Sequence, residues 1–359
     1  MKRLLIALSI IICQLSFSST GAQAQTQVSG YAPGVTPDGA TFFLPKTAIR
    51  IIVLAEKTTY TPGEYAAYAQ RFLRLNNVST EACESHRVIS VSQTAVGIAD
   101  TTKAYSVKFN PKTAAINVAL AQDGTLLAIN GQGEEQTLPK PFQPAQKTSL
   151  PDPHRFQNQE ILAAGSLAKM AQLTAEEIYD LRENRSLLIK GQADFMPQDG
   201  QQMKLMLEQL DTQDRALTSM FSGTTVSDTT EYVFFVIPDK NIDGQTLFRF
   251  SRHFGMVDAD DLSGVPYTIT VTDLNSVPKA VPTGKKKKAE NGLYYNVPGR
   301  LRSIISQGMA IVSQEEMPAA QFGNVELLIG DLFNKHYGTR LWLDPVTGAI
   351  NKLEAEQPK

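Results

Sequence analysis

The sequence predicts an α+β fold in which two β-rich lobes, made of antiparallel meanders and hairpins, flank an inserted helical segment. Three observations support this prediction. Short apolar runs separated by turn dipeptides fill the chain up to residue 130, which is typical of a β-meander. Apolar residues then recur at helical spacing between 161 and 221, and strand-like runs return after 226. Five prolines between Pro139 and Pro153 indicate an extended connector ahead of the helices.

The order of these patterns divides the chain into five parts. They are a signal peptide at 1–24, an N-terminal β-rich lobe with one capped helix at 25–135, a proline-rich linker at 136–154, a helical segment at 155–225 and a C-terminal β-rich lobe at 226–359. The length alone allows about two domains, and the linker is where we expect the boundary between them.

The first 24 residues have the pattern of a secretory signal peptide. Lys2 and Arg3 precede an apolar run, and Ala22-Gln23-Ala24 places small residues where signal peptidase recognises them. The run is too short for a permanent transmembrane helix, which takes about 20 residues. We therefore expect a protein exported to the periplasm, the cell surface or the medium, with no transmembrane segment in the mature chain.

The first lobe is predicted to hold a central strand followed by the capped helix. Apolar residues occupy both faces of the segment 49–55, as in a strand that is covered on two sides. Thr61, Pro62 and Glu64 then match a capping box, which predicts a helix that begins at Thr61. Gly63 is the one glycine at this turn, so the sequence does not predict a phosphate-binding loop.

Further strands and helices follow from the same reasoning. Strands are predicted over 105–109, 114–120 and 125–130, and helices over 161–173, 174–190 and 201–221. Gly191 and Gly223 are expected to end the last two helices. The last helix carries an apolar stripe that includes Met203, Met206 and Met220. Packing into a core is the expected use of this stripe, and a surface for a partner is the alternative.

Two pairs of similar segments suggest an internal duplication. The first pair is GATFFLPKTAI (39–49) with GLYYNVPGRL (292–301), and the second is FNPKTAAIN (109–117) with LDPVTGAIN (343–351). In the last segment Asp344-Pro345 predicts a type I turn, with Gly348 in the left-handed position. Independent reuse of good turn chemistry explains the matches equally well. A repeated unit without repeated catalytic residues would favour binding or scaffolding.

The chain offers little for catalysis. It contains neither the GxSxG elbow of serine hydrolases nor the HExxH motif of zinc peptidases. Cys83 and His86 are weak candidates for half of a metal site or for a thiol–imidazole pair, although burial of Cys83 as a small apolar residue is the expected outcome. We therefore predict no catalytic residue, no metal ligand and no cofactor.

The charge balance excludes one class of partner. The chain carries 36 acidic and 34 basic side chains, and a general nucleic-acid binder would show a basic excess or a basic face. We therefore expect no binding to nucleic acid.

Several segments together resemble a known family. LPKTAIRIIV, YTPGEYAAYAQRFL, AAQFG and LDPVTGAIN, on a chain with an export signal, look like an uncharacterised exported family of Bacteroidota, the domain of unknown function numbered 4831. The resemblance covers the whole mature chain, and it implies no assigned activity, cofactor or catalytic residue. Asp100-Thr101-Thr102 and Asp228-Thr229-Thr230 resemble the acceptor pattern for O-linked glycans in such bacteria, so Thr101 and Thr229 are candidate acceptors.

The sequence thus favours an exported, non-catalytic protein of the cell envelope that serves as a binding or assembly module. Its partner would be an envelope protein or a glycan, and peripheral association with an outer membrane is compatible with this role. The alternative is a hydrolase that acts on a glycan or a peptide through two acidic residues. A thiol-dependent enzyme using Cys83 and His86 is a weaker third option.

Overall fold

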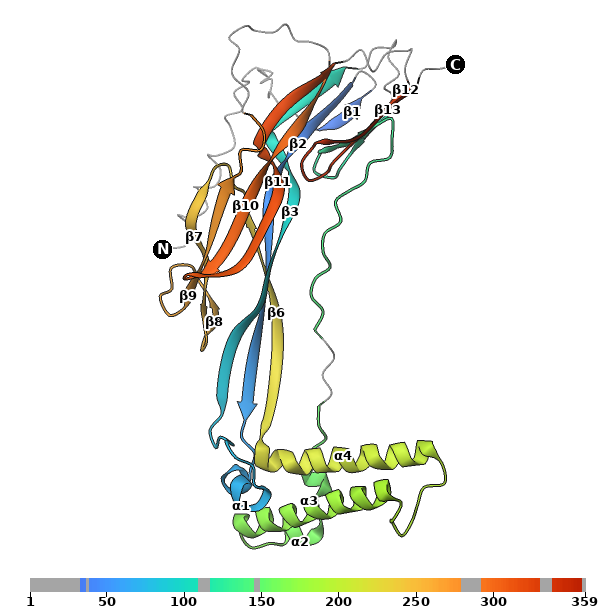
Figure 1. The fold of residues 1–359 in the computed structure, drawn as a ribbon, viewed down its shortest axis with the longest axis vertical. Helices are drawn as coiled ribbons and strands as arrows, with labels where there is room; N and C mark the ends of the chain where they lie inside the picture. Colours follow the sequence, from blue (N-terminus) through green and yellow to red (C-terminus); the bar gives the residue numbers. More distant parts are fainter. Residues whose placement is uncertain are drawn as a thin grey trace, which may run out of the picture.

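The computed structural model describes residues 33–36, 39–108, 117–144, 149–278, 292–329 and 338–356. The protein is mostly β, with several antiparallel sheets and few helices. It is elongated: three long strands lead away from a β-sandwich and end at a cluster of helices (Figure 1). The signal peptide predicted at 1–24 lies outside the described residues.

Three antiparallel sheets contain the described strands. In the first sheet, β2 (Gly39–Thr61) pairs with β3 (Cys83–Lys108) along one edge, and with β1 (Gly34–Thr36) and then β6 (Thr224–Val236) along the other. The second sheet has the order β11 (Ala310–Ile329), β10 (Gly292–Gln307), β9 (Val265–Asp273), β7 (Ile242–Ser251), β8 (Gly255–Val257). The third has the order β13 (Ile350–Glu356), β12 (Gly338–Leu343), β5 (Leu126–Ile129), β4 (Val118–Leu120).

The first and second sheets pack face to face around the main core. Ile49, Ile51 and Val53 of β2 are fully buried there against Phe248 and Ile305. Each such side chain contributes about 1.5–3 kcal/mol by leaving water. The strand predicted at 49–55 is therefore confirmed. It is longer than predicted, because β2 runs for 23 residues.

The predicted separation into two β-rich lobes is not confirmed. N-terminal β2 pairs with C-terminal β6, and N-terminal β5 pairs with C-terminal β12. A second apolar core, close to the third sheet, likewise combines Phe42 and Leu126 with Leu293 and Leu341. The two β-rich regions share their cores, so neither forms one by itself.

Two long hairpins have the same irregularity, which supports the duplication. In β2 the single residue Leu44 faces four residues of β3, Asp100–Lys103. In β10 the single residue Pro298 faces four residues of β11, Ala320–Gly323. Independent reuse of a turn does not explain two bulges of the same size, so they favour the duplication, which stays a prediction. The segment 109–116, which carries most of the other proposed copy, lies outside the described residues.

The turn predicted at Asp344-Pro345 is confirmed. The backbone N–H of Gly348 donates to the carbonyl oxygen of Asp344 at 2.7 Å, and Gly348 has φ of +72°. The Asp344 carboxylate also accepts hydrogen bonds from the backbone N–H groups of Val346 and Thr347. The tip of this hairpin is thus fixed by its own polar groups.

Beyond the sandwich, β2, β3 and β6 continue as a three-stranded stalk (Figure 1). None of the β2 residues from Glu56 to Thr61 is buried. Instead, ion pairs join the strands across their faces: Lys57 Nζ lies 2.9 Å from Glu84, and Arg87 Nε lies 2.6 Å from Glu56. Both faces of the stalk are therefore polar, and it has no core of its own.

The helices gather at the foot of the stalk. They are the short η1 (Ala66–Tyr68), α1 (Ala69–Leu73), η2 (Pro153–Phe156) and α2 (Gln159–Leu162), and the long α3 (Leu167–Lys190) and α4 (Gly200–Ser222). The helices predicted over 161–173 and 174–190 differ from the structure, because α3 crosses residues 173 and 174 without a break. Gly191 and Gly223 end the long helices as predicted, with φ of +69° and +72°.

The capping box predicted at Thr61 is wrong. Thr61 remains in β2 because it pairs with Thr224 of β6, and the first helical turn starts only at Ala66. Neither η1 nor α1 has a side-chain cap. Gly63 has a different role: it touches the end of α4, where an added Cβ would overlap the carbonyl oxygen of Met220.

We predict that Gly63→Ala lowers the free energy of unfolding by about 1–3 kcal/mol, because the added methyl group forces α4 away from the foot of the stalk. Urea denaturation followed by circular dichroism measures the change. Gly165→Ala is the control, since no atom lies within 4 Å of the position where its Cβ would be added. Equal stability of the two variants would contradict the close packing at Gly63.

Candidate functional site

The structure does not bring Cys83 and His86 together. They lie three residues apart on β3, so their side chains point to opposite faces of the strand. The expected burial of Cys83 is wrong, since β3 begins at the foot of the stalk, where no layer covers it and the thiol is exposed. His86 packs close to Gly255, and its Nδ1 is buried without a hydrogen bond to the described residues.

Thr101 and Thr229 have different surroundings. Thr101 is exposed in the four-residue bulge of β3. The Asp100 carboxylate accepts hydrogen bonds from the backbone N–H and the hydroxyl of Thr102, at 3.1 and 2.6 Å, and so fixes the bulge. Thr229 is half-buried within β6. Thr101 is therefore the more accessible of the two hydroxyls.

The described residues include no group of three or more His, Cys, Asp or Glu side chains placed to hold a metal ion. A hydrogen bond from Lys57 lowers the pKa of Glu84, and a hydrogen bond from Lys352 lowers the pKa of Glu354. The backbone N–H of Ser263 lowers the pKa of Asp261. These three carboxyls therefore stay charged at neutral pH, whereas a general acid needs a raised pKa.

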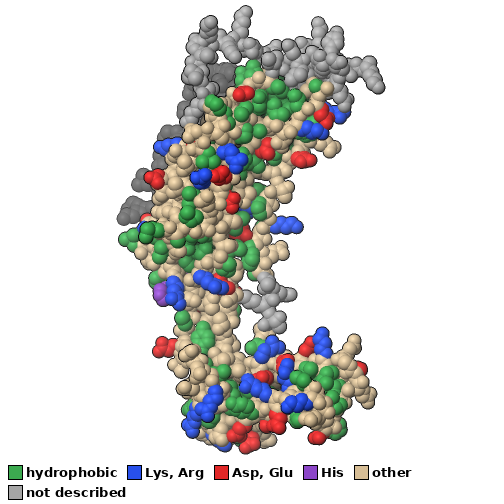
Figure 2. Space-filling view, in the orientation of Figure 1, with side chains coloured by type: hydrophobic (Ala, Val, Ile, Leu, Met, Phe, Trp, Pro, Cys, Tyr) green, Lys and Arg blue, Asp and Glu red, His purple; other side chains and the backbone are tan. Residues whose placement is uncertain are grey.

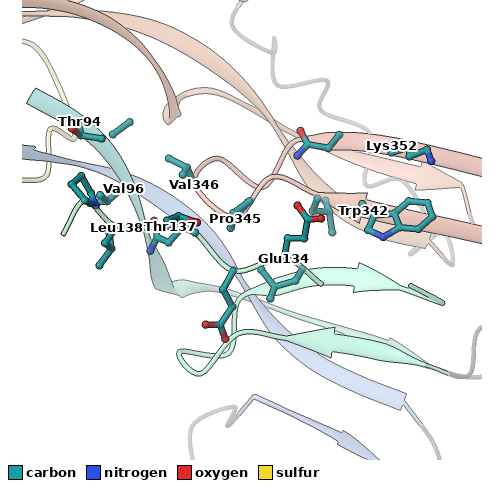
Figure 3. Close-up of a pocket in the computed structure, with 16 residues that line it drawn as sticks. Thr94, Val96, Glu134, Thr137, Leu138, Trp342, Pro345, Val346 and Lys352 are labelled. Carbon is teal, nitrogen blue, oxygen red and sulfur yellow. The ribbon is translucent and has the colours of Figure 1, made fainter. Parts of the chain in front are cut away.

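A pocket of about 630 Å³ lies beside the sandwich (Figure 3). Its walls come from β3, from the extended connector after β5, and from the β12–β13 hairpin. Trp342 and Lys352 lie at one end of the pocket, and Thr94, Val96 and Leu138 lie at the other (Figure 3). The volume falls within the usual range for small-molecule sites, about 300–1,000 Å³.

The connector wall of the pocket is held in place by Gln136. Its side-chain amide donates to the carbonyl oxygen of Gly97 at 2.8 Å and accepts from the N–H of Gly97 at 2.9 Å. Gly97 also allows the β12–β13 turn to approach, because a Cβ there would overlap the carbonyl oxygen of Pro345. Two sequence segments far apart thus meet on β3 to enclose the pocket.

Trp342 is the only tryptophan of the chain, and its ring is largely occupied by the protein itself. Lys352 Nζ lies over the ring, 5.1 Å from its centre. Gly131 packs against it so closely that a Cβ would lie 2.7 Å from Nε1. The ring is thus not a free stacking platform for a sugar. It fixes the start of the connector.

The remaining groups that line the pocket are better suited to binding a ligand than to catalysing a reaction. Val96 and Leu127 supply apolar surface, while Glu134, Asn351 and Lys352 supply a carboxylate, an amide and an ammonium group. Such a set can bind a ligand that has both polar and apolar parts. Sequence analysis missed this pocket because one wall, the β12–β13 hairpin, lies more than 200 residues from the other two. The lone tryptophan beside a well-defined turn was the one available signal.

The structure is thus that of a mostly β protein with a pocket beside its sandwich. A family model described as a domain of unknown function (DUF4831) matches residues 38–351. The chain therefore belongs to this family, and the resemblance to a family without an assigned activity is confirmed. No curated protein and no solved structure matches the chain.

We predict that Gln136→Ala releases the connector wall and lowers the free energy of unfolding by about 1–3 kcal/mol, because two hydrogen bonds to Gly97 are lost. The fluorescence of Trp342 reports the change directly, since no other tryptophan contributes. We expect a red shift and faster quenching by acrylamide. Gln143→Ala, an exposed glutamine on the same connector, is the matched control. An unchanged spectrum for Gln136→Ala would mean that the wall does not depend on this side chain.

Proposed function

We propose that the protein is an exported, non-catalytic protein of the cell envelope that acts as a binding or assembly module. The observation that carries this proposal is the elongated body, in which a polar stalk separates the pocket-bearing sandwich from the helical end (Figures 1 and 2). An enzyme does not need such a separation, whereas a protein that joins two components does. The proposed bacterial origin in Bacteroidota and the export signal agree with this role.

The connector supports the proposal because it ties both ends of the molecule together. After Gln136 it crosses the first sheet, where Arg50 Nη1 lies 3.5 Å from the carbonyl oxygen of Pro139. The N–H of Phe142 then donates to the Glu231 carboxylate at 2.6 Å. The chain continues to the helices, so the segment that walls the pocket also leads to the other end (Figure 1).

A hydrolase of glycans or peptides is the second candidate, and the presence of Glu134 and Glu135 at the pocket is the observation that favours it. Both side chains are exposed. The two carboxyls of a glycosidase face each other across the scissile bond in a cleft, and two adjacent, exposed side chains do not provide that arrangement. The binding role is therefore the better supported of the two.

No described helix combines the length and the apolar character that a membrane crossing needs. As part of the proposal, we expect attachment to the envelope to be peripheral, through an envelope protein or a glycan.

We predict that protein purified from the envelope fraction of the native cell has the mass of a chain that begins at Gln25.

An O-linked glycan on Thr101 would add a further mass. If Thr101 is the acceptor, Thr101→Ala removes this added mass and Thr229→Ala leaves it unchanged. Intact-mass spectrometry measures both effects. A chain that retains its first 24 residues would contradict export by a cleaved signal peptide, and a mass equal to the bare polypeptide would exclude glycans at both threonines.

We also predict that a photo-crosslinking amino acid placed at Glu134 captures an envelope protein or a glycan in the native cell. The same probe at Met309, which is fully exposed at the β10–β11 turn, is the control. Mass spectrometry of the two sets of adducts gives the comparison. Identical adducts at both positions, or turnover of a glycan or peptide by the purified protein, would count against a non-catalytic binding role.

A further inference from the structure

The outer half of the α3–α4 hairpin contains an apolar groove. The hairpin projects sideways from the foot of the stalk (Figure 1), and the groove between its helices has a volume of about 430 Å³. Its apolar lining includes Leu187 and Leu188 of α3, Met206 and Leu210 of α4, and Phe195 of the loop between them. Figure 2 shows hydrophobic side chains gathered on this part of the hairpin.

The two ends of the apolar stripe predicted on α4 are packed differently. Near the stalk, Leu217 and Phe221 are fully buried in the helical core, as expected for core packing. Farther out, Leu210 is only partly buried against that core, and Met206 of the stripe is 40% exposed; the neighbouring Leu205, which is not part of the stripe, is 67% exposed. The inner end of the stripe therefore packs into the protein more completely than the outer end, which needs another explanation.

The inner part of the same helix face is covered by a short segment. Met206 and Met220 lie 14 residues apart, so both side chains point to one face of α4. Gln157, which ends η2, forms a hydrogen bond from Nε2 to Met220 Sδ at 3.6 Å. The neighbouring Asn158 reaches Glu177 of α3 at 3.1 Å. The segment continues into α2, whose Ile161 is fully buried, but no residue of η2 or α2 lines the groove.

Charged groups are nearly absent from the groove. Its polar rim consists of amides, among them Gln209 and Gln213, and Asp194 is its one charged residue. The ion pairs that join α3 to α4, such as Arg185 with Asp211 at 2.6 Å, do not line it. In a two-fold interface between identical copies the same patch meets itself, so a patch with charges of one sign would repel itself. A neutral rim removes this cost.

The exposed apolar area is large enough for self-association. Exposed apolar side chains of the outer hairpin are Ile189, Phe195, Met196, Leu205 and Met206. Phe195 and Met206 line the groove, whereas Ile189, Met196 and Leu205 are each next in sequence to a residue that lines it. All five present on the order of 500 Å² of apolar surface, which is large for a monomer. A standard interface buries roughly 800 Å² on each partner, so a dimer would use these flanking side chains and the amide rim as well as the groove.

We infer that this groove is the interface through which two copies of the chain associate, their hairpins pairing into a four-helix bundle. The sideways projection of the hairpin lets a second copy approach without meeting the sandwich (Figure 1). The inference goes beyond the proposed function and holds whether or not the pocket binds a partner.

Sedimentation velocity of the mature chain, from about 1 to 100 μM, tests the inference through Gln209, which is exposed and lines the groove. We expect a dimer. Gln209→Lys and Gln209→Glu should each weaken it at least tenfold, because like charges then face each other, and an equimolar mixture should restore it. Met309→Lys is the control and should leave the dimer intact.

Each result of this experiment decides the inference. Because Gln209 is already exposed, its variants are expected to keep the wild-type circular dichroism spectrum, which verifies that the fold is intact. A wild-type chain that is monomeric at 100 μM would overturn the inference, and a helix of another protein would then be the better occupant. A dimer that persists in both Gln209 variants would also overturn it, since the interface would lie elsewhere.

Discussion

The pairing of β2 with its neighbours is the constraint on which the rest of the structure depends. This strand supplies Phe42 to the second core and Ile51 to the sandwich core, and its last residues form the middle of the stalk. A shift of its register by one residue would exchange the two faces of the strand, so side chains such as Ile51 would leave the core that they fill. In the stalk, by contrast, both faces are polar, so burial of apolar side chains does not fix the register there. The stalk therefore depends on the sandwich above it for correct alignment.

The same dependence explains how the connector is positioned. Its three contacts fall successively on Gly97 of β3, Arg50 of β2 and Glu231 of β6. These strands are hydrogen-bonded neighbours, so the connector crosses the whole width of the first sheet. Arg50 and Glu231 also lie within 4.0 Å of each other and are mostly buried. The pocket wall is consequently as well fixed as the sheet beneath it, although the connector has no regular secondary structure.

Local chemistry made some elements predictable from the sequence. The alternation at 49–55, the glycines that end α3 and α4, and the turn at Asp344 depend on neighbouring residues alone, and the structure agrees with each. Thr61 shows the limit of predicting elements from neighbouring residues alone. Its capping pattern is a sound local signal, but hydrogen bonds to β6 outweigh it, and β6 follows only after the whole helical segment. The pocket was not predictable for the same reason, since its walls meet only in the folded chain. The prediction that the apolar stripe of α4 packs into a core holds for its inner end only. Sequence periodicity shows which residues share a helix face, but not how far other elements cover that face.

The stalk also has a consequence for mechanical load. The hydrogen bonds of an antiparallel ladder lie across the strands, so a pull along the long axis of the molecule would act on many of them at once. They would resist as a group, unlike a hairpin that is peeled open one bond at a time. Such a body could transmit tension between whatever holds its two ends.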